Sequence, residues 1–386
     1  MRSGKENFAK RGDWQNAAIG ASNLSELELT LGEVAEAVGD AEQSVTYADR
    51  SGDAFEREAA CGLLADVLHH AGRRDEALKL FREVEAMQAK RTPGYPLSYS
   101  LRGFRYCDLL LTAPERVAWQ WLLECGDLSP LSAGDLSPSN VGTRANYREP
   151  LICDSALPTS RQSGESGDES PHSKTLRAVF QRAAQTLKYY ERGNWASLLD
   201  IALDHLTLGR AALYAAILED RARSPLPAAE SASHPEAERR TRSDAPYLET
   251  ARRELDTAVT GLRHAGQRQY LPHALLTRAW LRFLAGARTG SESAQEDLDE
   301  AWEIAERGPM KLHMADIHLY RARLFALPIA GSQLPIEKKY PWDRDLDGSP
   351  RGPKDDLAAA RKLIEQCDYW RRREELEDAE AAAENW

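Results

Sequence analysis

Residues 59–89, AACGLLADVLHHAGRRDEALKLFREVEAMQA, decide the fold of this chain. Small and apolar residues recur in it with successive gaps of 3, 4, 5, 4 and 3, at Ala65, Leu68, Gly72, Ala77, Phe81 and Val84. Gaps of three and four keep side chains on one face of a helix, and a glycine followed by polar residues is typical of a helix end. The stretch therefore predicts two antiparallel helices joined by a tight turn at Gly72.

The same spacing recurs elsewhere in the sequence. One copy has no insertion and comprises Ser25, Glu28, Gly32, Ala37, Ala41 and Ser44. Another has three extra residues in its turn and comprises Ala279, Arg282, Gly286, Ala294, Leu298 and Ala301. The first small position of each copy, which we call its anchor, is occupied in turn by Ser25, Ala65, Cys107, Gly209, Ala279 and Ala322. Anchors not separated by an insertion lie 40 to 43 residues apart, which indicates an internal repeat.

Three insertions interrupt the pattern, each between the first and the second helix of a pair. The second helix resumes at Val179, at Ala251 and in the segment 355–366, and the joins between pairs stay at 21 to 23 residues. In stacked repeats, insertions at equivalent turns emerge on one side. The sequence therefore predicts an all-α fold, a right-handed α-solenoid of about six antiparallel helix pairs with three long loops on one edge. The alternative is a set of unrelated amphipathic helices that match by chance.

The composition argues against several classes of protein. The 386 residues include 50 Lys+Arg and 61 Asp+Glu, and this net charge of −11 disfavours a nucleic-acid binder, whose surface is basic. The longest apolar run, Ala211–Leu218, is shorter than the roughly 18–20 residues of a membrane helix, and the N-terminus lacks the apolar core of a secretory signal. Five scattered cysteines without a CxxC pair disfavour a zinc ribbon and a disulfide framework. We therefore expect a cytoplasmic protein that binds neither nucleic acid nor membrane.

The unit Ala65–Gly72–Ala77–Phe81 resembles a tetratricopeptide repeat (TPR), with a period longer than the usual ~34 residues. Five further segments are similar to the extended C-terminal TPR arrays of bacterial signal-transduction (STAND-type) ATPases and of maltose-activator-like regulators: 16–38, 71–88, 99–111, 198–213 and 297–325. The resemblance covers most of the chain outside the insertions. It implies a TPR-like superhelix that binds a protein or peptide partner.

The chain departs from those long ATPases in one respect. It contains neither GxxxxGK[ST] nor GxGxxG, so their switch activity is not carried over. Its start, MRSGKENFAKRGDW, looks like the tail of an earlier repeat, and we therefore expect a fragment or a stand-alone array. The resemblance leaves open an upstream ATPase or effector module that is encoded separately.

The resemblance also implies a site along the concave groove. In TPR arrays the residue after the anchor, and those three and four positions further on, point into this groove. Carried over position by position, the groove residues are Asp66, His69, His70, Asp108, Arg210, Tyr214, Trp280, Phe283 and Arg323. Such a mixture of acidic, basic and aromatic groups suits a peptide or a partner helix, and an ordinary solvated groove is the alternative. The clamp that some family members use for a C-terminal carboxylate is not matched, because Gly62 and Asp66 stand where Asn is expected.

No catalytic motif is recognisable in the sequence. GxSxG, HExxH and HxE…PCxxC are all absent, and we expect no enzyme activity, no metal and no cofactor. Cys107 occupies an anchor position and is interpreted as a buried core residue. His69 and His70, like Asp204 and His205, are neighbours whose side chains diverge on a helix.

The sequence also predicts how the chain is divided. The expected units are a remnant of a preceding repeat (1–20), TPR-like repeats 1–2 with the first helix of repeat 3 (21–111), a disordered insertion (112–173), TPR-like helices (174–220), a linker insertion (221–246), TPR-like repeats (247–327), a Pro-rich loop (328–353) and a C-terminal capping helix (354–386). Trp342 is expected to pack back onto the array. Arginines 371–373 and the acidic residues 374–378 are interpreted as stabilising pairs on a solvent face.

These observations favour a non-catalytic scaffold or sensor array. It would bind a partner protein or peptide in the concave groove, as part of a bacterial signalling or defence system. The alternative is a receptor for a signal peptide or a small ligand. A hydrolase that uses scattered Asp, His and Cys residues has no motif to support it.

Overall fold

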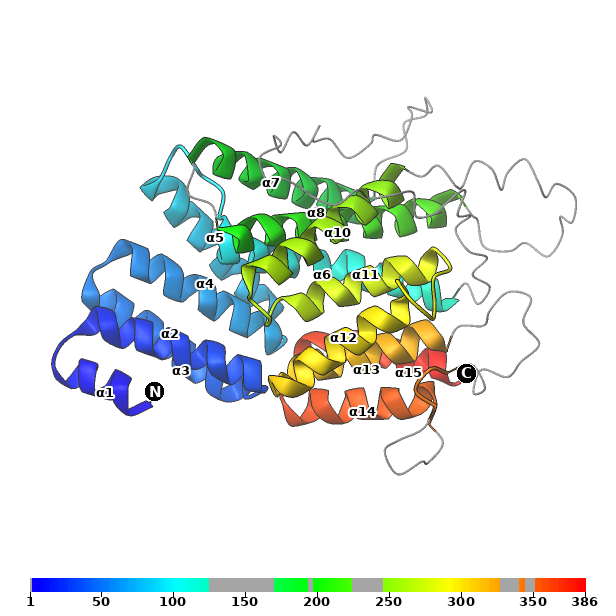
Figure 1. The fold of residues 1–386 in the computed structure, drawn as a ribbon. Helices are drawn as coiled ribbons and strands as arrows, with labels where there is room; N and C mark the ends of the chain where they lie inside the picture. The colour runs from blue at the N-terminus through cyan, green and yellow to red at the C-terminus, as the bar shows by residue number, and fades with distance from the viewer. Residues whose placement is uncertain (1, 125–169, 194–196, 224–245, 327–339, 344–350) are drawn as a thin grey trace, which may run out of the picture.

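The structure, a computed structural model, describes residues 2–124, 170–193, 197–223, 246–326, 340–343 and 351–386. Within these residues it contains 14 α-helices and no strand, which confirms the all-α prediction. The helices pack in neighbouring pairs (Figure 1). The pairs are α2 (Trp14–Leu31) with α3 (Val34–Ser51), α4 (Ala54–His70) with α5 (Arg74–Arg91), α6 (Ser100–Glu124) with α7 (Pro171–Gly193), α8 (Leu198–Arg223) with α10 (Pro246–Ala265), α11 (Leu271–Leu284) with α12 (Ala294–Arg307), and α13 (Lys311–Phe325) with α14 (Pro353–Gln366).

Three further elements flank these pairs. Helix α1 (Arg2–Lys10) precedes them and packs against α2. The short 3-10 helix η2 (Trp370–Arg372) leads into the last helix, α15 (Arg373–Ala383). The predicted single capping helix over 354–386 is therefore wrong, because the chain turns at Cys367–Tyr369 and makes two helices, α14 and α15.

The predicted turn at Gly72 is confirmed. Helix α4 ends at His70 and α5 begins at Arg74, and Gly72 has a φ of 76°, a left-handed conformation that glycine adopts without strain. Asp53 accepts hydrogen bonds at the start of α4 from the backbone N–H groups of Phe55 (2.8 Å) and Glu56 (3.0 Å). Local sequence therefore fixes both ends of this helix.

The anchors are wedged between helices, as the repeat pattern predicts. All six are buried: Ser25, Ala65, Cys107, Gly209, Ala279 and Ala322. Gly209 shows why a small residue is required, because an added Cβ would lie 2.7 Å from Leu255 Cγ on the paired helix α10. The small anchors thus let the two helices of a pair approach closely.

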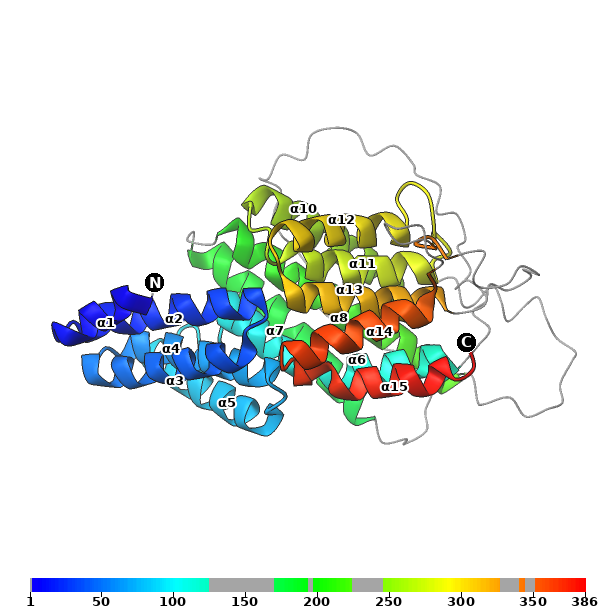
Figure 2. The ribbon, with the colours of Figure 1, turned by 90° about the horizontal axis from the view of Figure 1, so that it is seen from below.

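The first helices of the pairs also contact one another in succession. The contacts run from α2 to α4, α6, α8, α11 and α13, and α13 in turn touches α2. At that junction a Cβ added to Gly32 would lie 2.9 Å from Lys311 Cβ and 2.7 Å from Cys367 Sγ. Figures 1 and 2 both place the ends of α2 and α3 beside α12 to α14, so the N-terminal and C-terminal parts of the chain meet. The inner helices therefore enclose a common interior.

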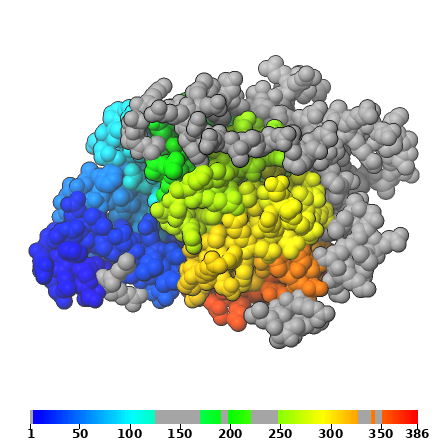
Figure 3. All heavy atoms as spheres, viewed as in Figure 1, coloured from blue at the N-terminus to red at the C-terminus, as the bar shows by residue number. Residues whose placement is uncertain are grey.

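The largest apolar cluster lies on one side of that interior. It joins α6, α7, α8 and α10 to α13, and its centre is Trp119 stacked on Trp280 with ring centroids 3.6 Å apart. Tyr320 packs edge-on against Trp119 at 5.0 Å. In the view of Figure 3 the atoms of α10 to α13 form a continuous surface beside those of the N-terminal helices.

Some predicted boundaries differ from the structure. Helix α6 continues to Glu124 and carries Pro114 inside it, so the insertion does not begin at residue 112. Helix α2 begins at Trp14, inside the segment expected to be a remnant. Most of the predicted insertions lie outside the described residues. Trp342, which is described, does pack back, with its ring 5.1 Å from that of Phe325.

Among the residues that the structure describes, one helix is long and apolar enough to cross a membrane. The segment Leu198–Glu219 of α8 meets that test by length and composition, contrary to the expectation that no segment approaches it. The protein itself buries 83% of the apolar window. Packing at the centre of the fold therefore accounts for its composition.

Gly209→Ala tests the close approach of α8 and α10. Overpacking against Leu255 is expected to lower the free energy of unfolding by about 1–3 kcal/mol, as measured by urea denaturation. Gly39→Ala in α3 is the matched control, because no atom lies within 4 Å of its added Cβ. Alanine there should stabilise the protein by about 0.5–1 kcal/mol. Equal effects at both positions would contradict the packing described.

Candidate functional site

The inner helices bring the predicted groove residues to the interior. All of these residues lie on α4, α6, α8, α11 and α13. Eight are buried and His70 is half-buried, so in this structure they do not line a solvated groove. Phe283 packs in the apolar cluster, with its ring 5.5 Å from that of Phe325. Trp280 lies in the same cluster, stacked on Trp119, whereas the other residues form or border a set of polar contacts. The part of all nine in binding stays a prediction.

The chain's own C-terminal segment, which we define as Tyr369–Glu375, contacts three of these residues, His70, Asp108 and Arg323. The Tyr369 ring stacks on His70 with centroids 5.6 Å apart, and its hydroxyl donates to Asp316 at 3.2 Å. Arg371 donates from Nη2 to Asp108 at 2.8 Å. The segment therefore reaches side chains on α4, α6 and α13 at once.

Arg372 has the most partners in the C-terminal segment. Its Nε donates to Asp316 at 2.9 Å, and its Nη1 donates to Glu375 at 2.6 Å and to Glu115 at 3.2 Å. Only 2% of its surface is exposed. A guanidinium can donate five hydrogen bonds in fixed directions, and three carboxylates accept hydrogen bonds from that of Arg372.

These contacts belong to one connected network of buried charges. We call it the interior ion network, and it comprises Asp108, Glu115, Asp316, Glu375, Arg210, Arg323, Arg371 and Arg372. Every member is buried. The network balances four carboxylates with four guanidiniums, so its net charge is zero. Buried charges persist only when they are paired in this way.

Arg210 joins the two carboxylates of α6. Its Nη1 donates to Asp108 at 2.7 Å and its Nη2 donates to Glu115 at 2.9 Å. Burial by itself would raise the pKa of both acids, but the guanidiniums outweigh it. Arg371 and Arg210 hold the pKa of Asp108 well below its usual value, and Arg372 and Arg210 lower the pKa of Glu115 to about 2. Both groups are therefore carboxylates at neutral pH.

Three histidines border the network as neutral groups. They are His69, His273 and His313. Burial lowers the pKa of each, and Arg371 lowers the pKa of His69 further, as Arg210 does for His273. His69 Nε2 and His273 Nε2 lie 3.8 and 3.9 Å from the Asp108 carboxylate.

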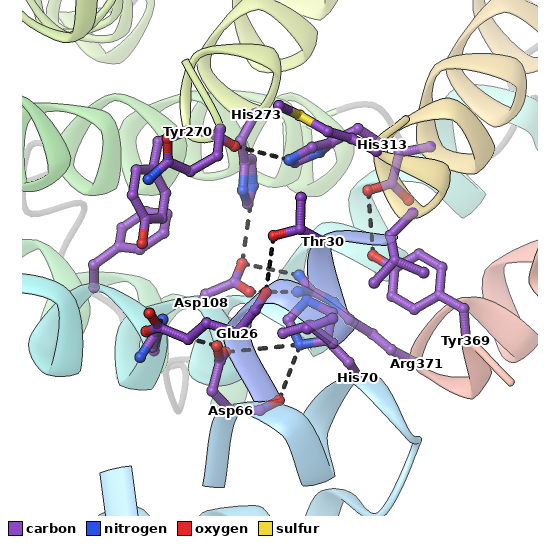
Figure 4. A pocket seen from close by; sticks show the side chains of 17 residues that line it. Glu26, Thr30, Asp66, His70, Asp108, Tyr270, His273, His313, Tyr369 and Arg371 are labelled. Atoms are coloured by element: carbon purple, nitrogen blue, oxygen red, sulfur yellow. Dashed lines mark hydrogen bonds and ion pairs between the residues drawn. The ribbon is translucent and has the colours of Figure 1, made fainter. Parts of the chain in front are cut away.

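A cavity of about 160 Å³ lies beside the C-terminal segment. Side chains from α2, α4, α6, α11, α13 and η2 face one another around it (Figure 4). Its wall carries four carboxylates (Glu26, Asp66, Asp108 and Asp316), two guanidiniums (Arg105 and Arg371) and three imidazoles (His70, His273 and His313). Apolar side chains complete it, among them Leu29, Phe104, Met310 and Leu312. The cavity is thus a polar site of small-molecule size built from distant parts of the chain.

Arg105 holds two of those carboxylates together. Its Nε lies 2.9 Å from Asp66 Oδ2, and its Nη2 donates to Glu26 Oε1 at 2.7 Å. One positive group is thus shared by two negative groups at this end of the cavity. The side chain of Glu26 remains 45% exposed, which places this end near solvent.

The interpretation of arginines 371–373 as a solvent-face cluster is wrong for the first two. Arg371 and Arg372 are buried in the interior ion network, and only Arg373 is exposed, where it pairs with Glu377. The three arginines belong to two elements: Arg371 and Arg372 lie in η2, whereas Arg373 begins α15.

The side chains of the other titratable residues singled out in the sequence contact different partners. Asp204 accepts from the Thr186 hydroxyl at 2.5 Å, whereas His205 contacts Glu254 at 2.6 Å. Cys107 is buried as predicted, and burial raises the pKa of its thiol to about 12. Among the residues that the structure describes, no group of three or more His, Cys, Asp or Glu side chains is arranged to hold a metal ion.

No protein-family model matches the chain, and no curated protein matches it.

Arg372→Ala tests the interior ion network. Removing this guanidinium leaves Glu115, Asp316 and Glu375 buried with less compensation, so the free energy of unfolding should fall by about 3–5 kcal/mol. The neighbouring Arg373→Ala removes only an exposed pair and should change it by less than about 1 kcal/mol. Denaturant unfolding of both variants measures the difference. Similar losses would contradict the assignment of Arg372 to the interior.

The buried histidines predict a loss of stability in mild acid. Because their folded pKa values are lowered, the unfolded chain binds protons below about pH 6.5 that the folded chain does not. Each therefore contributes full stability above that pH and loses up to about 1.4 kcal/mol per pH unit below it.

Unfolding curves between pH 7.5 and 5.0 measure this slope. His273→Asn should make it shallower, because one buried imidazole is gone. Identical slopes for His273→Asn and the unchanged protein would contradict this origin.

Proposed function

We propose that this chain is a non-catalytic, TPR-like array whose inner face recognises a short arginine-bearing peptide segment. The paired helices with buried small anchors support the TPR-like arrangement, and the succession of inner helices supports a right-handed solenoid turn. One observation carries the binding function. The inner face already holds such a segment, Tyr369–Glu375, through Asp108, Glu115 and Asp316.

The chemistry of this inner face fits a binding role. Carboxylates on α6 and α13 accept hydrogen bonds from the two guanidiniums, and His70 on α4 stacks on the tyrosine ring. Recognition of a peptide by charged and aromatic groups spread over several inner helices is how a groove gains specificity. A partner protein with a Tyr-x-Arg-Arg segment would meet the same groups in the same order. A role in bacterial signalling or defence, in the cytoplasm, follows from the resemblance of the sequence to regulatory arrays.

In this proposal the C-terminal segment occupies the partner's place. Helix α15, which follows the segment, is attached to α6. Arg116 Nε donates to Asp378 at 2.6 Å, and Gln120 donates to the same carboxylate at 3.1 Å. Exchange therefore requires the release of α15 from α6. A partner would compete with a segment whose effective concentration is high because it is tethered.

A second candidate function is a receptor for a small ligand. The cavity beside the C-terminal segment favours it, because a polar site of about 160 Å³ remains while the segment is in place. Small-molecule sites are concave, with an apolar wall and a few convergent polar groups, as this one is.

Peptide exchange in trans tests the first function. A fluorescent peptide of residues 367–386 is titrated into the full chain and into the full chain carrying Arg371→Ala and Arg372→Ala. The double variant, whose own segment has lost both guanidiniums, should bind the peptide at least tenfold tighter than the unchanged chain, as measured by fluorescence anisotropy.

The matched control is the same peptide with alanine at positions 371 and 372, which should bind neither chain. If the double variant is poorly folded alone, added wild-type peptide should raise its melting temperature and the control peptide should not. Equal binding of both peptides, or no binding and no stabilisation, would overturn the proposed recognition.

A further inference from the structure

We infer that the cavity beside the C-terminal segment binds a small organic cation, an ammonium or amidinium group attached to a compact apolar body. This inference deepens the small-ligand alternative, and it does not depend on whether the C-terminal segment exchanges. It rests on the charge of the wall, on the unused hydrogen-bonding groups and on the size of the space.

The charge of the wall favours a cation. Four carboxylates and two guanidiniums line the cavity, so negative groups exceed positive groups by two. The guanidiniums Arg210 and Arg372, from outside the cavity, compensate Asp108 and Asp316. Asp108, Asp316 and Arg371 belong to the interior ion network, which is neutral as a whole. Outside that network Glu26 and Asp66 share the single guanidinium of Arg105, which leaves an excess of one negative group. A ligand ammonium there would complete the charge balance.

An imidazole of the wall, that of His313, offers an acceptor. His313 Nε2 lies 2.9 Å from the backbone oxygen of Gln269, and because a carbonyl oxygen only accepts, this nitrogen carries the proton. His70 Nδ1 faces the backbone oxygen of Asp66 at 2.9 Å in the same way. Burial lowers the pKa of His313 and keeps its ring neutral. In the neutral ring of His313 the other nitrogen, Nδ1, is therefore an acceptor.

The second nitrogens of these two rings are unused. Among the residues that the structure describes, neither His313 Nδ1 nor His70 Nε2 makes a hydrogen bond. The other contacts of His70 are those of its ring with His69 and Tyr369 and that of its Nδ1 with the Asp66 carboxylate, which leave Nε2 available. The acceptor His313 Nδ1 and the two carboxylates Glu26 and Asp66 around this small space suit a ligand that brings N–H donors.

The size of the space limits the apolar body. A cavity of roughly 150 Å³ holds one benzene ring, and this cavity measures about 160 Å³. Phe104, Met310 and Leu312 supply an apolar wall, and the Tyr369 ring supplies an aromatic face for a cation. Benzylamine therefore matches both the polar and the apolar part of the site.

Three ligands with one ring and different head groups test the inference. Benzylamine, benzyl alcohol and benzoate are titrated into the full, unchanged chain by isothermal calorimetry. Benzylamine should bind at least tenfold tighter than benzyl alcohol, and benzoate should show no binding. Equal affinities, a preference for benzoate or no benzylamine binding would overturn the inference.

Variants locate the ligand in the cavity. His313→Leu removes an acceptor and should weaken benzylamine binding at least tenfold, whereas His313→Asn keeps an acceptor near the Nδ1 position and should bind within about threefold of the unchanged chain. Glu26→Gln, at a partly exposed position that does not threaten folding, should weaken it at least threefold. His264→Leu on the exposed face of α10 is the control and should have no effect. Unchanged binding in both His313→Leu and Glu26→Gln would place the ligand elsewhere and overturn the assignment.

These measurements separate the two functions. Benzylamine is titrated with the C-terminal segment in place, and the peptide test uses a chain in which that segment is loosened. A failed peptide exchange with selective amine binding would leave the small-ligand site standing alone. The opposite result would leave only peptide recognition.

Discussion

The interior ion network holds the inner helices and the C-terminal segment of this protein together. Its eight charged side chains lie on α6, α8, α13 and the C-terminal segment. The first of them in the sequence, Asp108, and the last, Glu375, are 267 positions apart. Charges buried at this depth are costly unless each finds a partner, and pairing satisfies them only when all four elements are assembled. The network therefore makes the closed arrangement of the inner helices all-or-none.

The composition of the network ties the C-terminal segment to the inner helices. Arg371 and Arg372 supply half of its positive groups, and without them Asp108, Glu115 and Asp316 would keep a buried negative excess. Under the proposed function, any replacement for the segment must bring two guanidiniums to the same carboxylates. In that proposal stability and recognition rest on the same contacts.

The cavity follows from the same construction. Beside the C-terminal segment, Glu26 and Asp66 share one guanidinium, that of Arg105, whereas the carboxylates of the interior ion network are matched by an equal number of guanidiniums. A polar space of this kind, with apolar side chains on its other walls, differs from a packing void, which would be apolar.

Most of the helices, their pairing and their small anchors could be predicted from the amino-acid sequence. Helices and tight turns depend on residues close together in the sequence, which leave a recognisable spacing, as Ala65, Gly72 and Ala77 show. The resemblance to TPR arrays, carried over position by position from the anchors, also implied that Asp66, Asp108, Arg210 and Arg323 lie on inner helices.

Only the tertiary structure shows that the inner helices close on one another. It also shows that Arg371 and Arg372 enter the space between them. A charge pair carries no periodic signal, and Arg371 lies 263 residues from Asp108. An arginine in a run of three therefore looks like a solvated residue until the fold removes the water around it.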